Sequence, residues 1–214
     1  MKYNTIIFDL DGTLLNTLDD LRDSLNDILA QKGYEPRSIE DVRSFVGNGV
    51  RNLVRLSVPE HCTEEEVSLC LKEFMEHYKN NMQNKTRPYN GIMELLLDLN
   101  RFNYKIGIVS NKYDAAVKSL SKTYFGNMIP VAIGESLEIK RKPAPDSVFM
   151  AIKELGSDLQ NTVYVGDSET DVQTAKNAGI PCIAVTWGFR CREVLRTAGA
   201  DYLIDTPKEL LTLI

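Results

Sequence analysis

The chain has 214 residues, of which 43% are hydrophobic and 26% charged, and its formal net charge is −5. This length suits one domain or a core with an insert, and the composition can fill a packed interior. The acidic balance argues against nucleic-acid partners and anionic membrane surfaces, since both need a basic footprint, and no apolar run approaches membrane-spanning length.

The cysteines and histidines do not indicate a metal or disulfide framework. The four cysteines contain no Cys-x-x-Cys pair, and Cys70 and His77 would lie about 10 Å apart along a helix, too far to share one zinc ion. The apolar stretch Ile6-Ile7-Phe8 is too short for a secretion signal. We therefore expect a cytoplasmic protein with reduced thiols.

The first strand is followed by a helical block. Residues Tyr3–Leu10 read as a buried strand that stops at Asp9-Leu10-Asp11-Gly12. Leucines and isoleucines from Leu18 to Leu29 repeat at helical spacing, and Thr63-Glu64-Glu65-Glu66 is a capping box before a second long helix. No strand pattern interrupts residues 17–84, with two or three more helices expected after the first. We predict a helical domain over residues 16–86.

Beyond Pro88 and Gly91, strands alternate with helices. The predicted strands are Lys105–Val109, Met128–Ile133, Thr162–Val165, Cys182–Val185 and Tyr202–Ile204. The predicted helices are Ile92–Phe102, Tyr113–Tyr124, Asp146–Leu155, Thr170–Ala178 and Lys208–Ile214. This alternation indicates an α/β fold, a three-layer Rossmann-like core with a parallel sheet. The core then comprises residues 1–15 and 87–214.

Polar residues follow four successive strands of this predicted core. In an open parallel sheet, ligands bind beyond the carboxyl ends of the strands. Those ends carry, in chain order, Asp9 and Asp11, then Ser110 and Asn111, then Lys142, and finally Asp167 and Asp171. Clustered carboxylates repel one another unless a cation shares the site, and an all-oxygen ligand set favours Mg²⁺. Magnesium, lysine and a hydroxyl on one rim suit a phosphate group.

Each of these features also has a structural interpretation. Asp-x-Asp-Gly is typical of a strand-to-turn junction, and Ser110-Asn111 is a plausible helix cap. Lys142 ends a charged run, and Asp171 completes a capping box with Ser168. Structural roles alone do not explain why all four groups arrive in order at successive strand ends, which favours the functional interpretation.

The sequence resembles the haloacid dehalogenase superfamily. The resemblance rests on four motifs: Phe8-Asp9-Leu10-Asp11-Gly12-Thr13-Leu14, Val109-Ser110-Asn111, Lys142-Pro143-Ala144-Pro145 and Val165-Gly166-Asp167-Ser168-Glu169-Thr170-Asp171. The helical block is similar to the family's small α-helical cap, inserted after the first strand. Its segment Phe45-Val46-Gly47-Asn48-Gly49 resembles the phosphoglycolate phosphatase branch.

The resemblance implies a role for each site residue. Asp9 is the implied nucleophile, Asp11 the general acid and base, and Ser110, Asn111 and Lys142 the phosphate-binding and charge-offsetting groups. Asp9, the Asp11 carbonyl and Asp167 are the implied Mg²⁺ ligands. Asp171 is expected to hold Lys142 or a metal-bound water, and Thr13 is expected to support the loop. In the cap, Gly47, Asn48 and Arg51 are candidates for substrate contact, with a helix–helix turn and a surface arginine as the equally weighted alternative.

An acid at the position of Asp11 favours a phosphatase or phosphomutase over the dehalogenases of the superfamily. We expect a Mg²⁺-dependent phosphatase acting on a small phosphorylated metabolite, with 2-phosphoglycolate as the best single substrate. A phosphomutase of the beta-phosphoglucomutase type and a pyrophosphatase are the alternatives. A retired phosphate-binding or interaction protein is more remote, because both Asp9 and Asp167 are present. A monomer and a homodimer are both left open.

Overall fold

A computed structural model describes residues 2–214 and divides the chain into two compact units. Of the described residues, 2–15 and 88–214 form the first unit, and 16–87 form the second. Within the described residues, no helix has the length and apolar character needed to cross a membrane.

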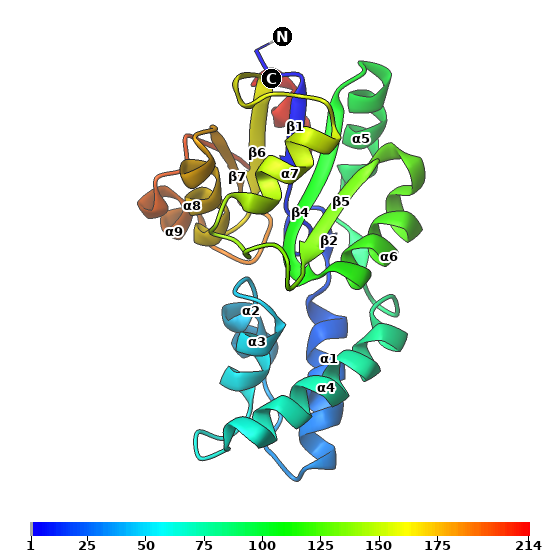
Figure 1. Ribbon diagram of the computed structural model, residues 1–214, viewed down its shortest axis with the longest axis vertical. Coiled ribbons are helices and arrows are strands. Elements are labelled where there is room, and N and C mark those ends of the chain that lie inside the picture. Colours follow the sequence, from blue (N-terminus) through cyan, green and yellow to red (C-terminus); the bar gives the residue numbers. More distant parts are fainter. Residues whose placement is uncertain (1) are drawn as a thin grey trace. The chain divides into compact units, whose positions relative to one another are not determined.

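The first unit is built on a six-stranded sheet. Its strands run in the order β5 (Val131–Glu135), β4 (Lys105–Tyr113), β1 (Thr5–Phe8), β6 (Thr162–Gly166), β7 (Cys182–Val185) and β8 (Tyr202–Ile204). Each neighbouring pair is parallel. The central strand β1 pairs with β4 on one side and with β6 on the other (Figure 1). The carboxyl end of β1, at Phe8, therefore lies in the middle of the sheet.

Helices cover both faces of this sheet. The helices are α5 (Ile92–Arg101), α6 (Asp114–Phe125), α7 (Asp146–Glu154), α8 (Glu169–Ala178) and α9 (Arg192–Ala198), with 3₁₀ turns at Gly126–Met128, Leu159–Asn161 and η3 (Pro207–Thr212). Val148 of α7 and Val172 of α8 pack with Ile7 and Tyr164 in one core cluster. Since side chains alternate along a strand and all four β1 residues are buried, the opposite face is covered as well. The expected three-layer α/β core is confirmed.

The second unit is helical. It contains α1 (Leu18–Gln31), α2 (Ile39–Phe45), α3 (Val50–Ser57) and α4 (Glu64–Asn81), whose apolar faces supply the buried side chains Leu25, Val42, Leu53 and Phe74. Capping boxes at Ser38 and Thr63 begin α2 and α4. The buried Asp20 carboxylate accepts hydrogen bonds from the backbone N–H groups of Lys85 and Thr86, which fixes the end of the unit to α1. The short strands β2 (Leu15–Asn16) and β3 (Arg87–Pro88) pair with each other.

Several predicted boundaries were wrong. Strand β4 continues to Tyr113 instead of ending at Val109, and β5 begins at Val131 because a 3₁₀ turn occupies Gly126–Met128. The expected last helix is the 3₁₀ helix η3, which starts at Pro207. Helix α9 was not predicted; it is seven residues long and buries only Leu195, so it gives no periodic pattern.

Candidate active site

Most sequence-predicted site residues come together at the carboxyl end of the sheet in the first unit. Asp9 directly follows β1, Ser110 lies within the last part of β4, and Asp167 directly follows β6. Asp171 lies in the first turn of α8, and Lys142 lies in the loop between β5 and α7. All five are buried.

Lys142 is the centre of the cluster. Its ammonium donates to Asp9 Oδ1 and Asp171 Oδ1, both at 2.7 Å, and to the Tyr164 hydroxyl at 3.1 Å. Burial lowers the pKa of Lys142, but the two carboxylates outweigh burial, so the pKa lies well above its ordinary value. The lysine therefore stays charged beside Asp9, which a solvated charge run would not require.

Asn111 fixes the backbone of Lys142. Its side-chain oxygen accepts from the Lys142 N–H at 2.8 Å, and its side-chain nitrogen donates to the Lys142 carbonyl at 3.0 Å. Neither Ser110 nor Asn111 caps helix α6, which begins after Tyr113. Ser110 Oγ accepts a hydrogen bond from the Lys112 N–H. Direct contact of Ser110 and Asn111 with a phosphoryl group stays a prediction.

Asp171 serves both the helix and the site. Its Oδ2 accepts from the Ser168 N–H and hydroxyl in a capping box, while its Oδ1 accepts from Lys142 and from the Tyr164 hydroxyl at 3.0 Å. Gly166 is needed beneath it, because a Cβ there would lie 2.4 Å from Asp171 Cγ. Asp171 therefore completes the predicted capping box and also contacts Lys142, while its role in the reaction stays a prediction.

Asp167 lies in a cradle formed by two glycines. A Cβ on Gly12 would lie 2.2 Å from Asp167 Oδ2, and one on Gly188 would lie 2.3 Å from Asp167 Cβ. Thr13 Oγ1 donates to Asp167 Oδ1 at 3.2 Å, and the Phe189 N–H donates to Oδ2 at 2.7 Å. These contacts hold the carboxylate in one orientation.

The acid cluster fits a divalent cation. Asp9, Asp167 and Asp171 each offer a carboxylate oxygen within 4.8 Å of the others. Burial, only partly offset by Lys142, raises the pKa of Asp9 to about 7 from 3.8. Burial and the charges of Asp171 and Asp9 raise the pKa of Asp167 well above its ordinary value. The single positive charge of Lys142 does not balance these three carboxylates, so a cation would stabilise them. Their hard oxygen donors suit Mg²⁺.

Hydrogen bonds reach both oxygens of Asp171, from Lys142, Tyr164 and Ser168, and both oxygens of Asp167, from Thr13 and the Phe189 N–H. The assignment of Asp9 and Asp167 as the metal ligands therefore stays a prediction. The backbone carbonyl of Asp11 as a third ligand stays a prediction.

Two functional contacts were missed from the sequence. Lys112 donates from Nζ to Asp11 Oδ1 at 2.9 Å, and the side chains are 5% and 11% exposed. Tyr164 contacts Lys142 and Asp171 through its hydroxyl. Lys112 directly follows Ser110-Asn111, which was a usable signal, whereas Tyr164 looks like any aromatic residue of a core strand.

The predicted cap residues lie in the second unit. Gly47 and Gly49 flank Asn48 with φ angles of +119° and +85°, in the turn between α2 and α3. Arg51, in the first turn of α3, pairs with Glu64 at 2.6 Å and donates to Ser68 Oγ at 3.3 Å, with 50% of its side chain exposed. The expected roles of Gly47, Asn48 and Arg51 toward a substrate stay predictions.

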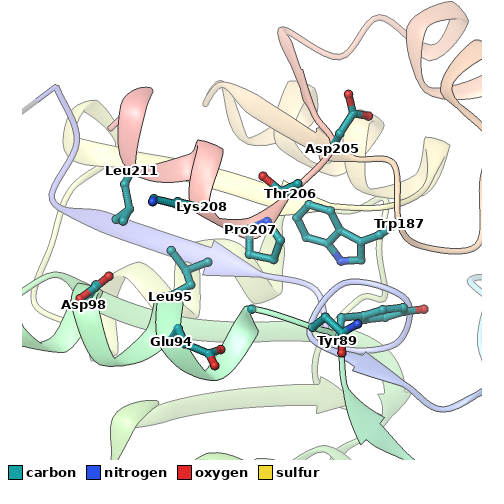
Figure 2. Close-up of a pocket in the computed structure, with 12 residues that line it drawn as sticks. Tyr89, Glu94, Leu95, Asp98, Trp187, Asp205, Thr206, Pro207, Lys208 and Leu211 are labelled. Atoms are coloured by element: carbon teal, nitrogen blue, oxygen red, sulfur yellow. The ribbon is translucent and has the colours of Figure 1, made fainter.

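A cavity of about 670 Å³ in the first unit is separate from the acid cluster. It lies between α5 and η3, with Tyr89 and Trp187 at one end and Asp98 and Leu211 at the other (Figure 2). None of Asp9, Lys142, Asp167 and Asp171 lines it. Trp187 links it to the site, because its indole N–H donates to the Thr13 carbonyl.

Comparison with known proteins agrees with this geometry. The profile of the family described as "Haloacid dehalogenase-like hydrolase" matches residues 6–185. A phosphoglycolate phosphatase of Mesorhizobium japonicum is 37% identical over 91% of this chain and 87% of its own. One of Caulobacter vibrioides is 33% identical over 98% and 92%.

Solved structures show the same similarity to phosphoglycolate phosphatases. A protein from Lactobacillus delbrueckii subsp. bulgaricus, 37% identical, superposes with a TM-score of 0.94 over 100% of this chain and 99% of its own. A predicted phosphoglycolate phosphatase from Haemophilus somnus 129PT, 26% identical, reaches 0.92 over 100% and 98%. With the buried Asp9–Lys142–Asp171 cluster at the carboxyl end of its sheet, the chain belongs to the haloacid dehalogenase-like hydrolases, in the branch of the phosphoglycolate phosphatases, which hydrolyse phosphate monoesters.

Proposed function

We propose that this phosphatase is Mg²⁺-dependent and hydrolyses a small phosphorylated metabolite, preferably 2-phosphoglycolate, through a phosphorylated Asp9. The observation that carries the proposal is the buried Asp9 carboxylate held 2.7 Å from the Lys142 ammonium at the centre of the sheet. A nucleophile needs this arrangement, because an anionic carboxylate approaching an anionic phosphate requires a fixed positive charge beside it.

Asp9 and Asp167 would hold Mg²⁺, which when bound offsets the charge of the phosphoryl oxygens. Lys142 keeps Asp9 in its attacking form, since its charge favours the carboxylate. Asp171 and Asn111 position Lys142 from its side chain and its backbone. In this proposal Ser110 donates a hydrogen bond to a phosphoryl oxygen.

Asp11 is the proposed acid and base. The Asp9 carboxylate attacks phosphorus and the bond to the leaving oxygen breaks, while Asp11 gives that oxygen a proton. A water molecule then gives a proton to Asp11 and attacks the phosphorus, and the bond to Asp9 breaks. Inorganic phosphate leaves, and both aspartates return to their starting states.

The substrate assignment is supported by the names of the relatives, which are phosphoglycolate phosphatases of Mesorhizobium japonicum and Caulobacter vibrioides. The second unit is the proposed cap, with Arg51 pairing with the carboxylate of the substrate. A cytoplasmic location is part of the proposal, and the four free cysteines are consistent with a reducing compartment.

The test is kcat/KM with Mg²⁺ across 2-phosphoglycolate, pyrophosphate, a hexose phosphate and a nucleoside monophosphate, together with two variants. Asp9→Asn should abolish turnover. Asp11→Asn should lower turnover by about 10²–10⁴-fold and accumulate an aspartyl-phosphate with acetyl phosphate, visible as one added phosphoryl group by intact mass. Wild-type turnover in Asp9→Asn would refute the mechanism, and dependence on a bisphosphate activator would indicate a phosphomutase instead.

A further inference from the structure

A second buried lysine lies at the site, in an irregular part of β4. Val109 of β4 pairs with Ile133 of β5, but the next paired residues are Tyr113 and Glu135. Between these two pairs, β4 has three residues, Ser110 to Lys112, and β5 has only Gly134, so β4 forms a bulge there. Bulges of this kind redirect side chains beside active sites.

Strand β5 holds the backbone of this bulge closely. A Cβ on Gly134 would lie 2.7 Å from the Lys112 carbonyl oxygen and 2.5 Å from Asp114 Cα. The Gly134 N–H also donates to Asp114 Oδ1 at 3.1 Å. These contacts hold the backbone on the carboxyl side of Lys112, and the Lys112 N–H donates to Ser110 Oγ on its amino side. The Lys112 side chain therefore starts from a defined position.

The ammonium of Lys112 is directed to Asp11. Nζ and Asp11 Oδ1 are 2.9 Å apart, and both side chains are almost completely buried. A buried charge is stable only when it is paired, so this contact differs from the screened ion pairs of the surface. The two lysines contact different carboxylates: Lys142 donates to Asp9 and Asp171, and Lys112 donates to Asp11.

The charges of the site agree with the pairing of Lys112 and Lys142 with different carboxylates. Asp9, Asp11, Asp167 and Asp171 bring four negative charges when ionised, and Lys112 and Lys142 offset two of them. Without Lys112, one negative charge more would face the phosphate group of the substrate.

We propose that Lys112 is a positioning residue that fixes which oxygen of Asp11 faces the leaving group; the proposal rests on the function proposed above. An ammonium donates hydrogen bonds and accepts none. With Lys112 on Oδ1, a proton carried by Asp11 is therefore on Oδ2.

Both steps then use the same oxygen. In the first, the proton passes from Oδ2 to the leaving oxygen as its bond to phosphorus breaks and the Asp9–phosphorus bond forms. In the second, Oδ2 takes the proton of the attacking water, whose oxygen binds phosphorus as the bond to Asp9 breaks. Lys112 keeps its own proton throughout.

A double-mutant cycle tests this role. We compare wild type, Lys112→Met, Asp11→Asn and the double variant on phenyl phosphate, a poor leaving group, and on p-nitrophenyl phosphate, a good one. Lys112→Met should lower kcat by about ten- to hundred-fold on phenyl phosphate and by less than about threefold on p-nitrophenyl phosphate, since only the former needs a well-placed proton. KM should stay nearly constant. In the Asp11→Asn background, Lys112→Met should have no further effect.

The controls separate positioning from folding. Lys122→Met removes an exposed lysine of α6, and it should leave activity unchanged. Lys112→Arg retains the donor and should recover part of the lost kcat. Lys112→Gln provides the neutral variant if thermal melting shows that the methionine variant is unfolded.

Two outcomes would overturn the inference: an equal loss of kcat on both substrates, or losses that multiply in the double variant. Either would mean that Lys112 acts on the substrate or on the fold and not through Asp11. Failure of the proposed function looks different, because the wild-type protein with Mg²⁺ would then turn over neither ester.

Discussion

The indole N–H of Trp187 donates a hydrogen bond to the backbone carbonyl of Thr13 at 3.0 Å, across 174 residues of sequence. Thr13 in turn donates from its hydroxyl to Asp167 Oδ1 at 3.2 Å. A residue of the separate cavity between α5 and η3 is therefore two hydrogen bonds away from a proposed metal ligand.

We predict that Trp187→Phe lowers the free energy of unfolding by about 0.5–1.5 kcal/mol, the net value of one hydrogen bond. It should also weaken Mg²⁺ binding, because the loop that carries Thr13 loses an anchor. Urea unfolding and calorimetric Mg²⁺ titration measure the two effects. Unchanged Mg²⁺ affinity in Trp187→Phe would refute the link to Asp167.

Gly188→Ala should weaken Mg²⁺ binding by about tenfold or more, because the new Cβ would lie 2.5 Å from Asp167 Oδ2 and 2.4 Å from the Gly12 carbonyl oxygen. The matched control is Gly179→Ala, where φ is +72° and no atom lies within 4 Å of the added carbon. That change costs about 1–2 kcal/mol through backbone strain alone. It should lower the melting temperature and leave Mg²⁺ affinity intact. Weaker Mg²⁺ binding in Gly179→Ala, with unchanged binding in Gly188→Ala, would contradict the role of Gly188 beside Asp167.

The contribution of Asp9 and Asp167 to the stability of the metal-free protein should fall as the pH rises from about 4 to about 7. The pKa of Asp9 is about 7 in the folded chain against an ordinary 3.8, and that of Asp167 is also raised. In this interval the folded state binds more protons than the unfolded state, so the free energy of unfolding decreases with pH. Mg²⁺ binds the ionised carboxylates, and its stabilising effect should grow over the same interval.

Thermal melting in EDTA and in Mg²⁺ across this pH range measures both trends. Exposed carboxylates whose pKa is lowered, such as Asp41 and Asp158, shift acid stability in the opposite direction. The quantity to compare is therefore the difference in melting temperature between wild type and Asp9→Asn at each pH. A metal-free difference that stays flat with pH would show that Asp9 ionises as an ordinary aspartate.

Arg51→Ala should raise KM for 2-phosphoglycolate by about ten- to hundred-fold and leave p-nitrophenyl phosphate nearly unaffected, if Arg51 binds the substrate carboxylate. Its exposed ion pair with Glu64 holds it only weakly, so a substrate can compete for it. Arg55→Ala is the matched control, since Arg55 lies on the same helix and also approaches Glu64. Equal loss in both arginine variants would reject a specific role for Arg51.

The sequence predicted the α/β core and the proximity of Asp9, Lys142, Asp167 and Asp171 because strand ends in a parallel sheet share one edge. It did not predict the bulge in β4, since the register between Val109 and Tyr113 depends on which residues of β5 lie opposite. Lys112 was missed for that reason. Tyr164 was missed because its hydroxyl finds Lys142 and Asp171 only through the packing of α8 and of the loop before α7.

Asp171 both caps helix α8 and holds Lys142, above a position where only glycine fits. A mutation of Asp171 should therefore change both the stability of the fold and the turnover. Laboratory evolution cannot gain stability at the expense of activity, or the reverse, at this residue. A library selected only for thermal resistance should keep aspartate at 171, and so should one selected only for activity. Gains in either property have to come from positions that do only one of the two tasks.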